Sequence, residues 1–479
     1  MVSMEQKNIV DTVFGAKPNL RTLVETHGEA SYLSYLHTQT DATILDRDDA
    51  MDALFMKVWE QLMRQYFDAR LTTELTDELK KNFFASTADH GGPICHPFFT
   101  NAFFARALDA HSQSKELVLT LPCSGVSLDN SSFPRGLFFH DKNLHPVRLH
   151  IKSLAERHDS IYSASPYTKE DIAHIEKEIS TIDISNEQKR ILVSLVKDIF
   201  DRNDQYARAT YDEQMVRVNW LLPKYVHGYE HVEHISIGQE ILVRELLLLH
   251  LDSDTFISKL LVDNEVQKVY KDVFDGIAGA HTTTPQKGTQ MFWGLDNDGV
   301  RQQLSIADDG WYTTTGSLFL KRNKESLRQA LIEKKIYPNM ALTFIVLCFV
   351  HKITCGGGFS QINYLGEMKS AYEKLCASVG HTPGELPGTD VFTGELIVNV
   401  LEKDGVSVPA TLLDTILYQD DTTSQVLKHA CNTIPLKDAI WAMMPEYYKI
   451  ITGESVDAQT MKEFPLPPAT LHVQHDTNI

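Results

Sequence analysis

Residues 117–136 read Leu-Val-Leu-Thr-Leu-Pro-Cys-Ser-Gly-Val-Ser-Leu-Asp-Asn-Ser-Ser-Phe-Pro-Arg-Gly, and this stretch decides the class of fold. Its first five residues form a short apolar run that is typical of a buried strand, and a helix-like segment over 97–110 precedes it. A polar loop follows the strand. This arrangement, which begins near Ser86, predicts an α/β protein.

The loop after this strand is a candidate binding region. In open α/β sheets, ligands collect beyond the carboxyl ends of strands, where loops present polar groups. Ser124, Asn130, Ser131 and Arg135 are the candidate substrate-binding residues, and the Arg135 guanidinium suits a carboxylate or a phosphate. An ordinary polar loop is the alternative. Cys123 is more typical of a small buried residue than of a nucleophile, because nothing in the sequence indicates a lowered pKa.

A first Gly-rich turn precedes the strand, in Ser86-Thr-Ala-Asp-His-Gly-Gly-Pro-Ile-Cys-His-Pro97. Backbone amides at such a turn can hold an anion where the turn opens onto a helix. Asp89 and His90 are therefore the candidate catalytic residues for proton transfer, and His96 is a candidate substrate contact. The alternative is a tight turn in which His96 caps the helix. A metal site formed by these three side chains matches no specific ligand spacing.

A second Gly-rich turn, Cys355-Gly-Gly-Gly-Phe-Ser-Gln-Ile-Asn-Tyr364, follows an apolar run over 340–350. Its glycines let the backbone approach a ligand closely, so Gly357 and Gly358 are candidate binding positions, with Gln361 and Tyr364 on the next element. A crowded packing turn explains the glycines equally well. The sequence contains neither a nucleophile elbow nor a Walker-type phosphate loop.

The histidine-rich segment His227-Gly-Tyr-Glu-His-Val-Glu-His234 gives a metal-binding alternative. If the segment is helical, His227, His231 and His234 share one face, because positions i, i+4 and i+7 align. Gly228 and the lack of a clear helical pattern weaken this hypothesis, and a solvated histidine face is the competing interpretation. The chain has 20 histidines, so clustering by chance is common.

Hydrophobic periodicity divides the chain into five expected regions. These are a helical N-terminal region over 1–85, a first part of the α/β core over 86–167, a Lys-, Glu- and Asp-rich helical arm over 168–223, a second part of the core over 224–451, and an extended surface tail over 452–479. The second part of the core includes predicted helices over 236–251 and 325–333. It also includes a hairpin of strands over 289–294 and 300–306, joined by Asp296-Asn-Asp-Gly299.

Composition excludes some classes of partner. The 479 residues are 43% hydrophobic, which is enough for a sizeable core. A net charge of −19 disfavours nucleic acid and acidic lipid surfaces, although a local basic pocket can still hold an anionic small molecule. Residues 1–19 lack the apolar stretch of a signal peptide, and the longest apolar run is about half of the roughly 20 residues that span a bilayer. With six cysteines and no CxxC pair, we expect a cytoplasmic protein without a membrane segment.

The order of these segments resembles the bacillithiol-synthesis cysteine-adding ligase family. The clearest likeness runs from Tyr337-Pro-Asn-Met-Ala-Leu to Gly357-Gly-Phe-Ser-Gln-Ile-Asn-Tyr364, which is similar to that family's Pro-Asn, apolar run and Gly-Gly-x-x-Glu-x-x-Tyr pattern. Met291-Phe-Trp, the hairpin and the helix from Lys324 fit the same region, and Thr87-Ala-Asp-His-Gly-Gly-Pro occupies the place of the family's early turn. The resemblance is patchy over about residues 85–375 and implies a Rossmann-like core with a helical arm.

The chain departs from the family pattern at three places. Thr343-Phe344 stands where the family has Arg-Pro, and Gln361 stands where it has glutamate. Ser127-Leu-Asp-Asn130 replaces an acid-and-histidine group after the first core strand. We therefore expect the family fold to carry over more safely than its chemistry.

Three functions are consistent with the sequence. The first is an enzyme of ligase or transferase type, which the resemblance makes carbon–nitrogen bond forming, acting on a small polar or anionic metabolite in a cleft between the two Gly-rich turns. For this first function, an amino-acid-like metabolite and a nucleotide-dependent reaction are both open. The second is a metal-dependent enzyme using a histidine cluster, and the third is a non-catalytic, ligase-like binding or scaffold protein. The cofactor stays open, with ATP, ADP or a divalent metal as candidates, and the amphipathic arm predicts a homodimer.

Overall fold

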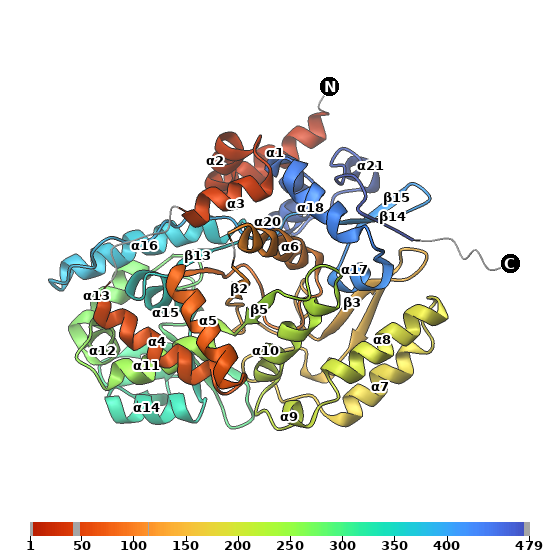
Figure 1. Cartoon of the computed structure of the whole chain (residues 1–479). Coiled ribbons are helices and arrows are strands. Elements are labelled where there is room, and N and C mark those ends of the chain that lie inside the picture. Colours follow the sequence, from red (N-terminus) through yellow and green to blue (C-terminus); the bar gives the residue numbers. More distant parts are fainter. Residues whose placement is uncertain (1–2, 42–47, 114, 474–479) are drawn as a thin grey trace.

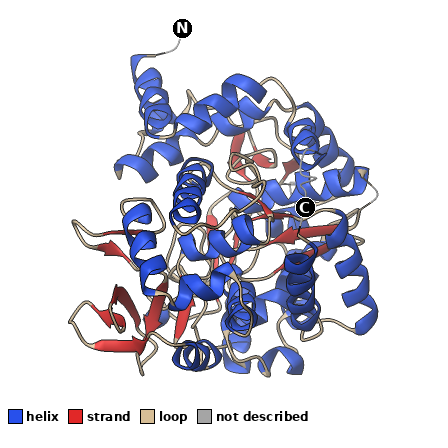
Figure 2. Ribbon diagram, turned by 90° about the vertical axis from the view of Figure 1, so that its left-hand side faces the viewer, coloured by secondary structure: helices blue, strands red, loops and turns tan. Residues whose placement is uncertain are grey.

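The chain folds as a mixed α/β protein in which helices surround several sheets, as predicted (Figures 1 and 2). The structure is a computed structural model that describes residues 3–41, 48–113 and 115–473. None of the helices within these ranges combines the length and the apolar character needed to cross a membrane.

A four-stranded parallel sheet lies at the centre of the fold. Its strands are β1 (Phe84–Ser86), β2 (Leu117–Thr120), β5 (Glu233–Ser236) and β13 (Thr354–Gly356), in the order β13-β1-β2-β5. All neighbours are parallel. The chain advances from β1 to β2 to β5 on one side and then returns to place β13 on the other side of β1. The direction of strand addition therefore reverses beside β1.

Both faces of this sheet are covered by helices. Val118 of β2 packs in a hydrophobic cluster with α6 (Pro97–Ser112), whereas Leu119 packs in another cluster with α4 (Asp49–Met63) and α11 (Gln239–Leu251). Successive side chains of a strand point to opposite faces. The predicted strand is apolar at nearly every position because both of its faces are buried.

A five-stranded antiparallel sheet contains the predicted hairpin. Its strands are ordered β11-β10-β9-β8-β12, and their bounds are β8 Phe292–Leu295, β9 Arg301–Ala307, β10 Gly310–Thr313, β11 Leu318–Lys321 and β12 Ile336–Pro338. Strands β8 and β9 pair antiparallel with Trp293 opposite Gln303, which confirms the hairpin. Gly299 has φ +77°, the positive value that the predicted Asp-Gly turn requires.

Three small sheets complete the strand inventory. They consist of β3 (Gly136–His140) with β4 (Pro146–His150), β6 (His281–Thr282) with β7 (Lys287–Gly288), and β15 (Val406–Pro409) with β14 (Val400–Lys403) and β16 (Leu471–His472).

The predicted helices over 97–110, 236–251 and 325–333, and the helical period that starts at Asp49, are confirmed as α6, α11, α14 and α4. The apolar run over 340–350 is α15 followed by a π-helical turn. The other helices are α1 Met4–Ala16, α2 Pro18–His27, α3 Tyr32–Asp41, α5 Ala69–Lys81, α7 Lys169–Ile179, α8 Asn186–Ile199, α9 Asn203–Tyr206, α10 Tyr211–Leu221, α12 Phe256–Val262, α13 Asn264–Phe274, α14 Lys324–Ile332, α15 Met340–Phe344, α16 Gln361–Ser378, α17 Leu412–Tyr418, α18 Thr423–Thr433, α19 Leu436–Trp441, α20 Met444–Thr452 and α21 Ala458–Met461, with 3-10 turns at Leu154–Glu156 and Leu222–Tyr225 and the π turn at Ile345–Val350.

The tail over 452–479 is not the extended surface segment that we expected. It contains α21 and β16, and β16 pairs parallel with β14. Phe464 and Leu471 are buried because their apolar side chains fill gaps in two hydrophobic clusters. Residues 474–479 of the predicted tail lie outside the described residues.

The two ends of the described chain lie against each other. Helix α1 packs on α20, Ser3 Oγ donates to Glu463 Oε2 (2.5 Å), and Gln6 Nε2 donates to the Glu463 carbonyl oxygen (2.6 Å). The first three helices and the last described helices thus share one hydrophobic cluster.

Helices α7 and α8 form a pair at one end of the molecule, within the predicted arm (Figure 1). Their apolar side chains are buried in a cluster that also contains residues of α10 and α17. These side chains are Ile172, Ile175, Ile179, Leu192, Leu195, Val196 and Ile199. The apolar stripe that motivated the predicted homodimer is therefore covered within the chain itself.

Candidate functional site

The loops after β1, β2 and β13 leave the parallel sheet at one edge and contact each other directly. Cys123 N donates to the Asp89 carbonyl oxygen (2.8 Å), and Gly91 N donates to that of Cys123 (2.9 Å). Thr87 N donates to the Gly356 carbonyl oxygen (2.7 Å). The two Gly-rich turns and the polar loop after β2 therefore form one continuous edge.

The space between the two Gly-rich turns is filled by protein. Gly357 N donates to the Val391 carbonyl oxygen (2.9 Å), and Thr393 N donates to that of Gly357 (2.9 Å), so this segment extends the sheet beyond β13. Gln361 Nε2 donates to Thr87 Oγ1 (2.6 Å), and a Cβ at Gly357 would collide with the Gln361 side chain. The predicted cleft between the turns is thus closed, and close packing accounts for the glycines.

Asp89 and His90 point to different partners. The Asp89 carboxylate is buried 4.0 Å from Arg106 Nη2, and burial raises its pKa to about 6 although the guanidinium opposes this shift. His90 Nδ1 lies 3.0 Å from Ser132 Oγ and 3.3 Å from Asn130 Oδ1. Burial lowers the pKa of His90, which favours the neutral ring.

The other predicted site residues are dispersed. His96 is the N-cap of α6, where Nδ1 accepts from Phe98 N (3.4 Å), so the alternative role predicted for it is confirmed. Burial lowers the pKa of His96 to about 3. Ser131 is exposed, and Arg135 is buried with its guanidinium 6.0 Å from the centre of the Phe133 ring.

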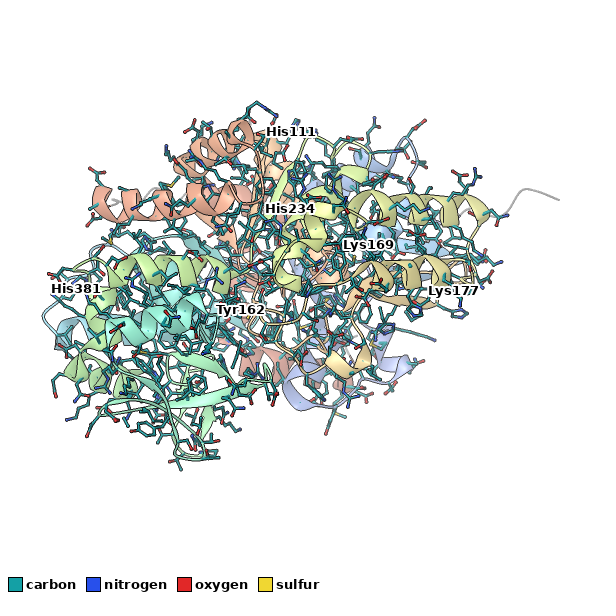
Figure 3. The ribbon with its side chains drawn as sticks, turned by 90° about the horizontal axis from the view of Figure 1, so that it is seen from below. His111, Tyr162, Lys169, Lys177, His234 and His381 are labelled. Carbon is teal, nitrogen blue, oxygen red and sulfur yellow. The ribbon has the colours of Figure 1, made fainter. Side chains whose placement is uncertain are left out.

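The histidine cluster does not form a helical face. Gly228, with φ +84°, turns the chain between His227 and His231, and His234 lies in strand β5. His234 is fully buried inside the fold, with Nε2 3.1 Å from Thr120 Oγ1 (Figure 3). The helix on which the metal-binding alternative depended is absent because the chain turns before it enters the sheet, and the competing solvated histidine face does not include the buried His234. In the described part of the chain, no group of three or more His, Cys, Asp or Glu side chains is placed to hold a metal ion.

An open cleft of about 400 Å³ lies beyond the carboxyl end of β2. Cys123, Gly125 and Glu240 line it from the loop after β2 and the first turn of α11, and Trp293 and Arg301 line it from the hairpin. The rest of the lining comes from Val126, 276–282, 287–288 and 338–340. The volume falls within the usual range for small-molecule sites. None of the residues predicted for the site lines this cleft.

Arg301 is held in position at the rim of the cleft. Its guanidinium carbon lies 4.4 Å from the centre of the Trp293 ring, and Nη1 donates to the Gly125 carbonyl oxygen (2.8 Å). The side chain is otherwise exposed, as is that of Lys287 on the same cleft. A guanidinium fixed by stacking and one hydrogen bond can present its other N–H groups to a carboxylate or phosphate.

Glu240 is the buried carboxylate of the cleft. Its Oε2 accepts from Ser124 N (2.8 Å) and its Oε1 from Gly125 N (2.9 Å), while Cys123 Sγ donates to Oε1 (3.5 Å). Burial raises the pKa of Glu240, although these amide bonds favour the ionised form. Burial and the Glu240 charge together raise the pKa of the Cys123 thiol, so Cys123 is a protonated donor rather than a thiolate nucleophile.

A second buried carboxylate, Asp212, lies behind Glu240 at the beginning of α10. Burial, reinforced by the charge of Glu240, raises the pKa of Asp212 to about 7. The Ser124 hydroxyl lies beside Asp212 and lowers this pKa by a smaller amount. Two neighbouring carboxylates with raised pKa values are an arrangement found at sites of proton transfer.

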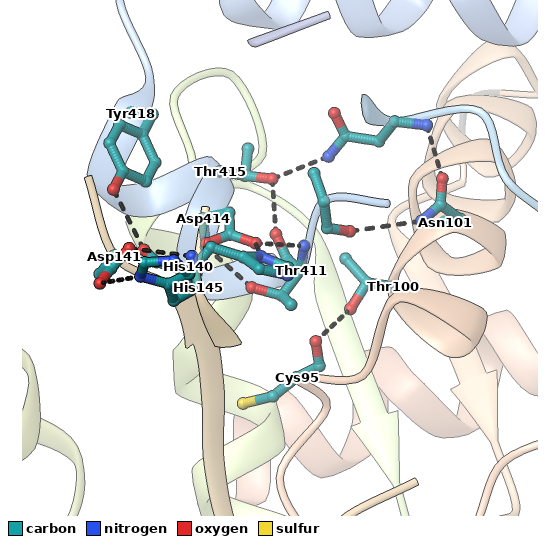
Figure 4. A network of polar contacts seen from close by, with 12 residues as sticks. Cys95, Thr100, Asn101, His140, Asp141, His145, Thr411, Asp414, Thr415 and Tyr418 are labelled. Atoms are coloured by element: carbon teal, nitrogen blue, oxygen red, sulfur yellow. Dashed lines mark hydrogen bonds and ion pairs between the residues drawn. The ribbon is translucent and has the colours of Figure 1, made fainter. Parts of the chain in front are cut away.

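A buried His140 and Asp414 pair elsewhere in the fold is a structural clamp (Figure 4). Asp414 accepts from the backbone N of His140 (2.7 Å) and from that of Thr411 (2.9 Å), and its Oδ2 lies 2.7 Å from His140 Nδ1. The carboxylate therefore caps α17 and ties this helix to β3. No further role is needed to explain the pair.

Glu240, Asp212 and Arg301 were not among the site residues predicted from the sequence. Glu240 follows Gly238 at a turn from a strand into a helix, which is the signal that singled out the first Gly-rich turn. Asp212 gives no signal, because an acid in the first turn of a helix is ordinary. Arg301 is one of many exposed arginines until the hairpin places it over the cleft.

Comparison with known proteins assigns the chain to no family. The chain matches no protein-family model, and no curated protein matches it. A functional proposal therefore depends on the geometry of the cleft and on the resemblance of motifs.

Proposed function

We propose that this protein is an enzyme of ligase or transferase type that acts on a small polar metabolite with an anionic group, in the cleft beyond the carboxyl end of β2. The observation that carries the proposal is the pairing of a buried carboxylate, Glu240, with a cation at the rim, Arg301, in one cleft of metabolite size. One end of the cleft thus suits proton transfer and the other suits an anion.

The chemistry follows from the environments of the two side chains. Burial raises the pKa of Glu240, and a carboxylate with a raised pKa accepts a proton from a nucleophile more readily than an ordinary one. Glu240 is also held by two amide donors, so it faces the cleft in one orientation. Arg301, fixed on Trp293, would hold the carboxylate or phosphate of the substrate at a set distance from this base.

The sheet supports the Rossmann-like core that the resemblance implies. Its order β5-β2-β1-β13, with a change of direction beside β1, is that of the first four strands of a Rossmann fold. Ligands of such sheets bind beyond the carboxyl ends of the strands. The cleft lies at this edge, one strand away from the change of direction.

A screen of ligand binding tests the proposal. We expect a nucleotide, an amino acid or a sugar phosphate to raise the Tm of the wild-type protein, because binding to the folded state alone stabilises it. For that ligand, Arg301→Ala should weaken binding at least about tenfold in calorimetry, equivalent to about 1.4 kcal/mol. Glu240→Gln should abolish turnover while keeping most of the binding.

Arg70→Ala is the matched control for this screen, because Arg70 is an exposed α5 residue that pairs with Glu74. It should bind like the wild type. Equal affinities in Arg301→Ala and the control, or no stabilisation by any of the three ligand classes, would contradict the proposal.

One observation favours a non-catalytic binding protein as a second candidate. Gln361, which stands where the resembling family has glutamate, is engaged by Thr87 Oγ1 and the Cys355 carbonyl oxygen (3.4 Å). This position is occupied by structural hydrogen bonds rather than by an acid. Binding without turnover under every combination of the three ligand classes with ATP and Mg²⁺ would favour this candidate.

A further inference from the structure

We propose that Arg135, Arg148 and His150 form a binding site for a phosphate group around the Phe133 ring. None of these residues lines the cleft beyond the carboxyl end of β2. The site therefore goes beyond the proposed function and does not depend on it. It gives a role to Arg135, whose guanidinium suits an oxyanion but has no part in the cleft.

Arg135 is a buried cation that lacks a partner. The residue is 6% exposed, and its Nε and Nη1 atoms are buried without reaching hydrogen-bond geometry with any described residue. Across residues 3–41, 48–113 and 115–473, no carboxylate lies close enough to form an ion pair with it. A buried guanidinium is costly unless acceptors and an opposite charge meet it. An anion from outside the chain would supply both.

The backbone holds Arg135 in place at the end of the β3–β4 ribbon. Its carbonyl oxygen accepts from Ile151 N (2.8 Å) and from Lys152 N (2.9 Å). The carbonyl oxygen of the preceding residue, Pro134, accepts from the Tyr211 hydroxyl (2.7 Å). The chain at Arg135 therefore cannot move outwards to expose the guanidinium to water without breaking these hydrogen bonds.

The Phe133 ring is the point around which the three side chains gather. The guanidinium carbons of Arg135 and Arg148 lie 6.0 and 5.2 Å from the ring centre, and the His150 ring meets it edge-on with 5.3 Å between the centres. Phe133 has φ +51°, a value that is uncommon for a residue other than glycine. Backbone strain of this kind persists where the surrounding structure enforces it, and it is concentrated at functional sites.

Arg148 and His150 present their side chains to solvent from strand β4. They are two positions apart, so they project from the same face of the β3–β4 ribbon. Both residues are exposed. Arg148 also lies 5.7 Å from the centre of the Phe138 ring, but it forms no ion pair within the described part of the chain. Its N–H groups are therefore free to bind an anion beside Phe133.

Positive charge predominates around His150. Burial and then the charge of Arg135 lower the pKa of His150, and Arg148 adds to this effect. Glu178 opposes the shift, but its Oε1 lies 3.2 Å from His174 Nε2 on the same helix. The local field thus favours an anion, although the chain as a whole carries a net charge of −19.

A phosphate group matches this set of side chains. Guanidinium groups bind phosphate through pairs of parallel hydrogen bonds, and a neutral imidazole such as that of His150 has one N–H to donate. A phosphate monoester carries nearly two negative charges at neutral pH, which the two guanidinium groups balance, whereas a single carboxylate carries only one. Inorganic phosphate and the phosphate of a small metabolite share this chemistry.

Calorimetric titration with sodium phosphate at pH 7.5 and constant ionic strength tests the site. The protein used is Arg301→Ala, because this change removes the cation on which anion binding in the cleft depends. We expect this protein to bind one phosphate per chain. Adding Arg135→Met, which removes the charge but keeps a long side chain, should weaken binding at least about tenfold. Adding Arg148→Ala should weaken it at least about threefold.

Arg190→Met is the matched control, because Arg190 is a 76% exposed α8 residue that pairs with Glu187. It should leave phosphate binding unchanged. If Arg135→Met does not fold, the exposed pair Arg148→Ala and His150→Gln together should weaken binding at least about tenfold. A second titration with glycerol 3-phosphate distinguishes the two sources, since tighter binding than that of inorganic phosphate indicates a metabolite and equal or weaker binding indicates the free ion.

Two results would overturn the proposal. The first is phosphate binding by the wild type that Arg301→Ala abolishes, or no phosphate binding by either protein. The abolished binding would place the anion in the cleft and would leave the proposed function intact. The second is unchanged affinity after Arg135→Met, or after Arg148→Ala with His150→Gln.

Discussion

Replacing Asp212 by asparagine keeps the shape of this side chain but removes its ability to ionise. In the folded protein, burial and Glu240 raise the pKa of Asp212 from 3.8 to about 7. The folded state therefore holds this proton more tightly than the unfolded state does. The stability contributed by the protonated acid is fully present below pH 3.8 and is lost as the pH rises through about 7.

The size of the effect follows from the same two values. One pKa unit corresponds to about 1.36 kcal/mol, so the rise from 3.8 to about 7 costs the wild type about 4 kcal/mol at pH 8, and about 2 kcal/mol at pH 5. An asparagine side chain at this position does not ionise and carries neither cost. We therefore expect the free energy of unfolding of Asp212→Asn, relative to that of the wild type, to increase by about 2–3 kcal/mol from pH 5 to pH 8.

Guanidinium unfolding followed by tryptophan fluorescence at pH 5, 6, 7 and 8 measures this difference. Asp254→Asn is the matched control, because the Asp254 side chain is 89% exposed and lies 3.7 Å from Lys259 at the surface. The control should follow the wild type at every pH. If Asp212→Asn also follows the wild type in parallel, Asp212 is ionised at no cost and the reasoning fails.

Three further substitutions test other parts of the fold. His250 lies 3.0 Å from His351 between the two Nε2 atoms, and burial lowers its pKa to about 4. Between pH 7.5 and 5 the free energy of unfolding of the wild type should fall by about 2 kcal/mol because of His250, and His250→Gln should not show this part of the fall. Guanidinium unfolding measures the difference, and an unchanged pH dependence in the variant would contradict it. Asp414→Ala leaves two backbone donors and His140 without their acceptor and should cost about 3–5 kcal/mol in the same assay, and a loss below about 1 kcal/mol would show that the clamp is dispensable. Gly238→Ala has an allowed backbone conformation but crowds the Asp212 carboxyl group and the Ser124 hydroxyl, so a loss of about 1–3 kcal/mol is expected from the Tm, and an unchanged Tm would refute the close packing.

Local patterns in the sequence predicted the elements well. The apolar run at 117–121, the Asp-Gly turn of the hairpin and the three- and four-residue spacing from Asp49 each depend on contacts within a few residues, so the sequence shows them directly. The order of the strands depends on contacts between residues far apart in the chain, so the sequence does not show it directly. Ser86 pairs with Gly356, and nothing near either residue indicates the other.

The cleft of the proposed function lies at the edge of the sheet where the candidate site was expected, but none of the predicted site residues lines it. The loop after β2 was singled out, and Gly125 of that loop lines the cleft, but the residues named in it do not. Val391 and Thr393 fill the space between the Gly-rich turns. Neither residue belongs to a sequence pattern that predicts this role. Glu240 and Asp212 come together from two helices, so their shared environment exists only after folding.

The contact of Ser3 with Glu463 has a consequence for synthesis of the chain. The two residues are 460 positions apart, which a ribosome working at about 5–20 residues per second covers in roughly 20–90 s. During that time the apolar faces of α1 to α3 are outside the ribosome without the helices that cover them in the folded protein. Helices α1 to α3 are thus made long before the segments that cover them, and chaperones that shield apolar helices would act on this protein while it is still being translated.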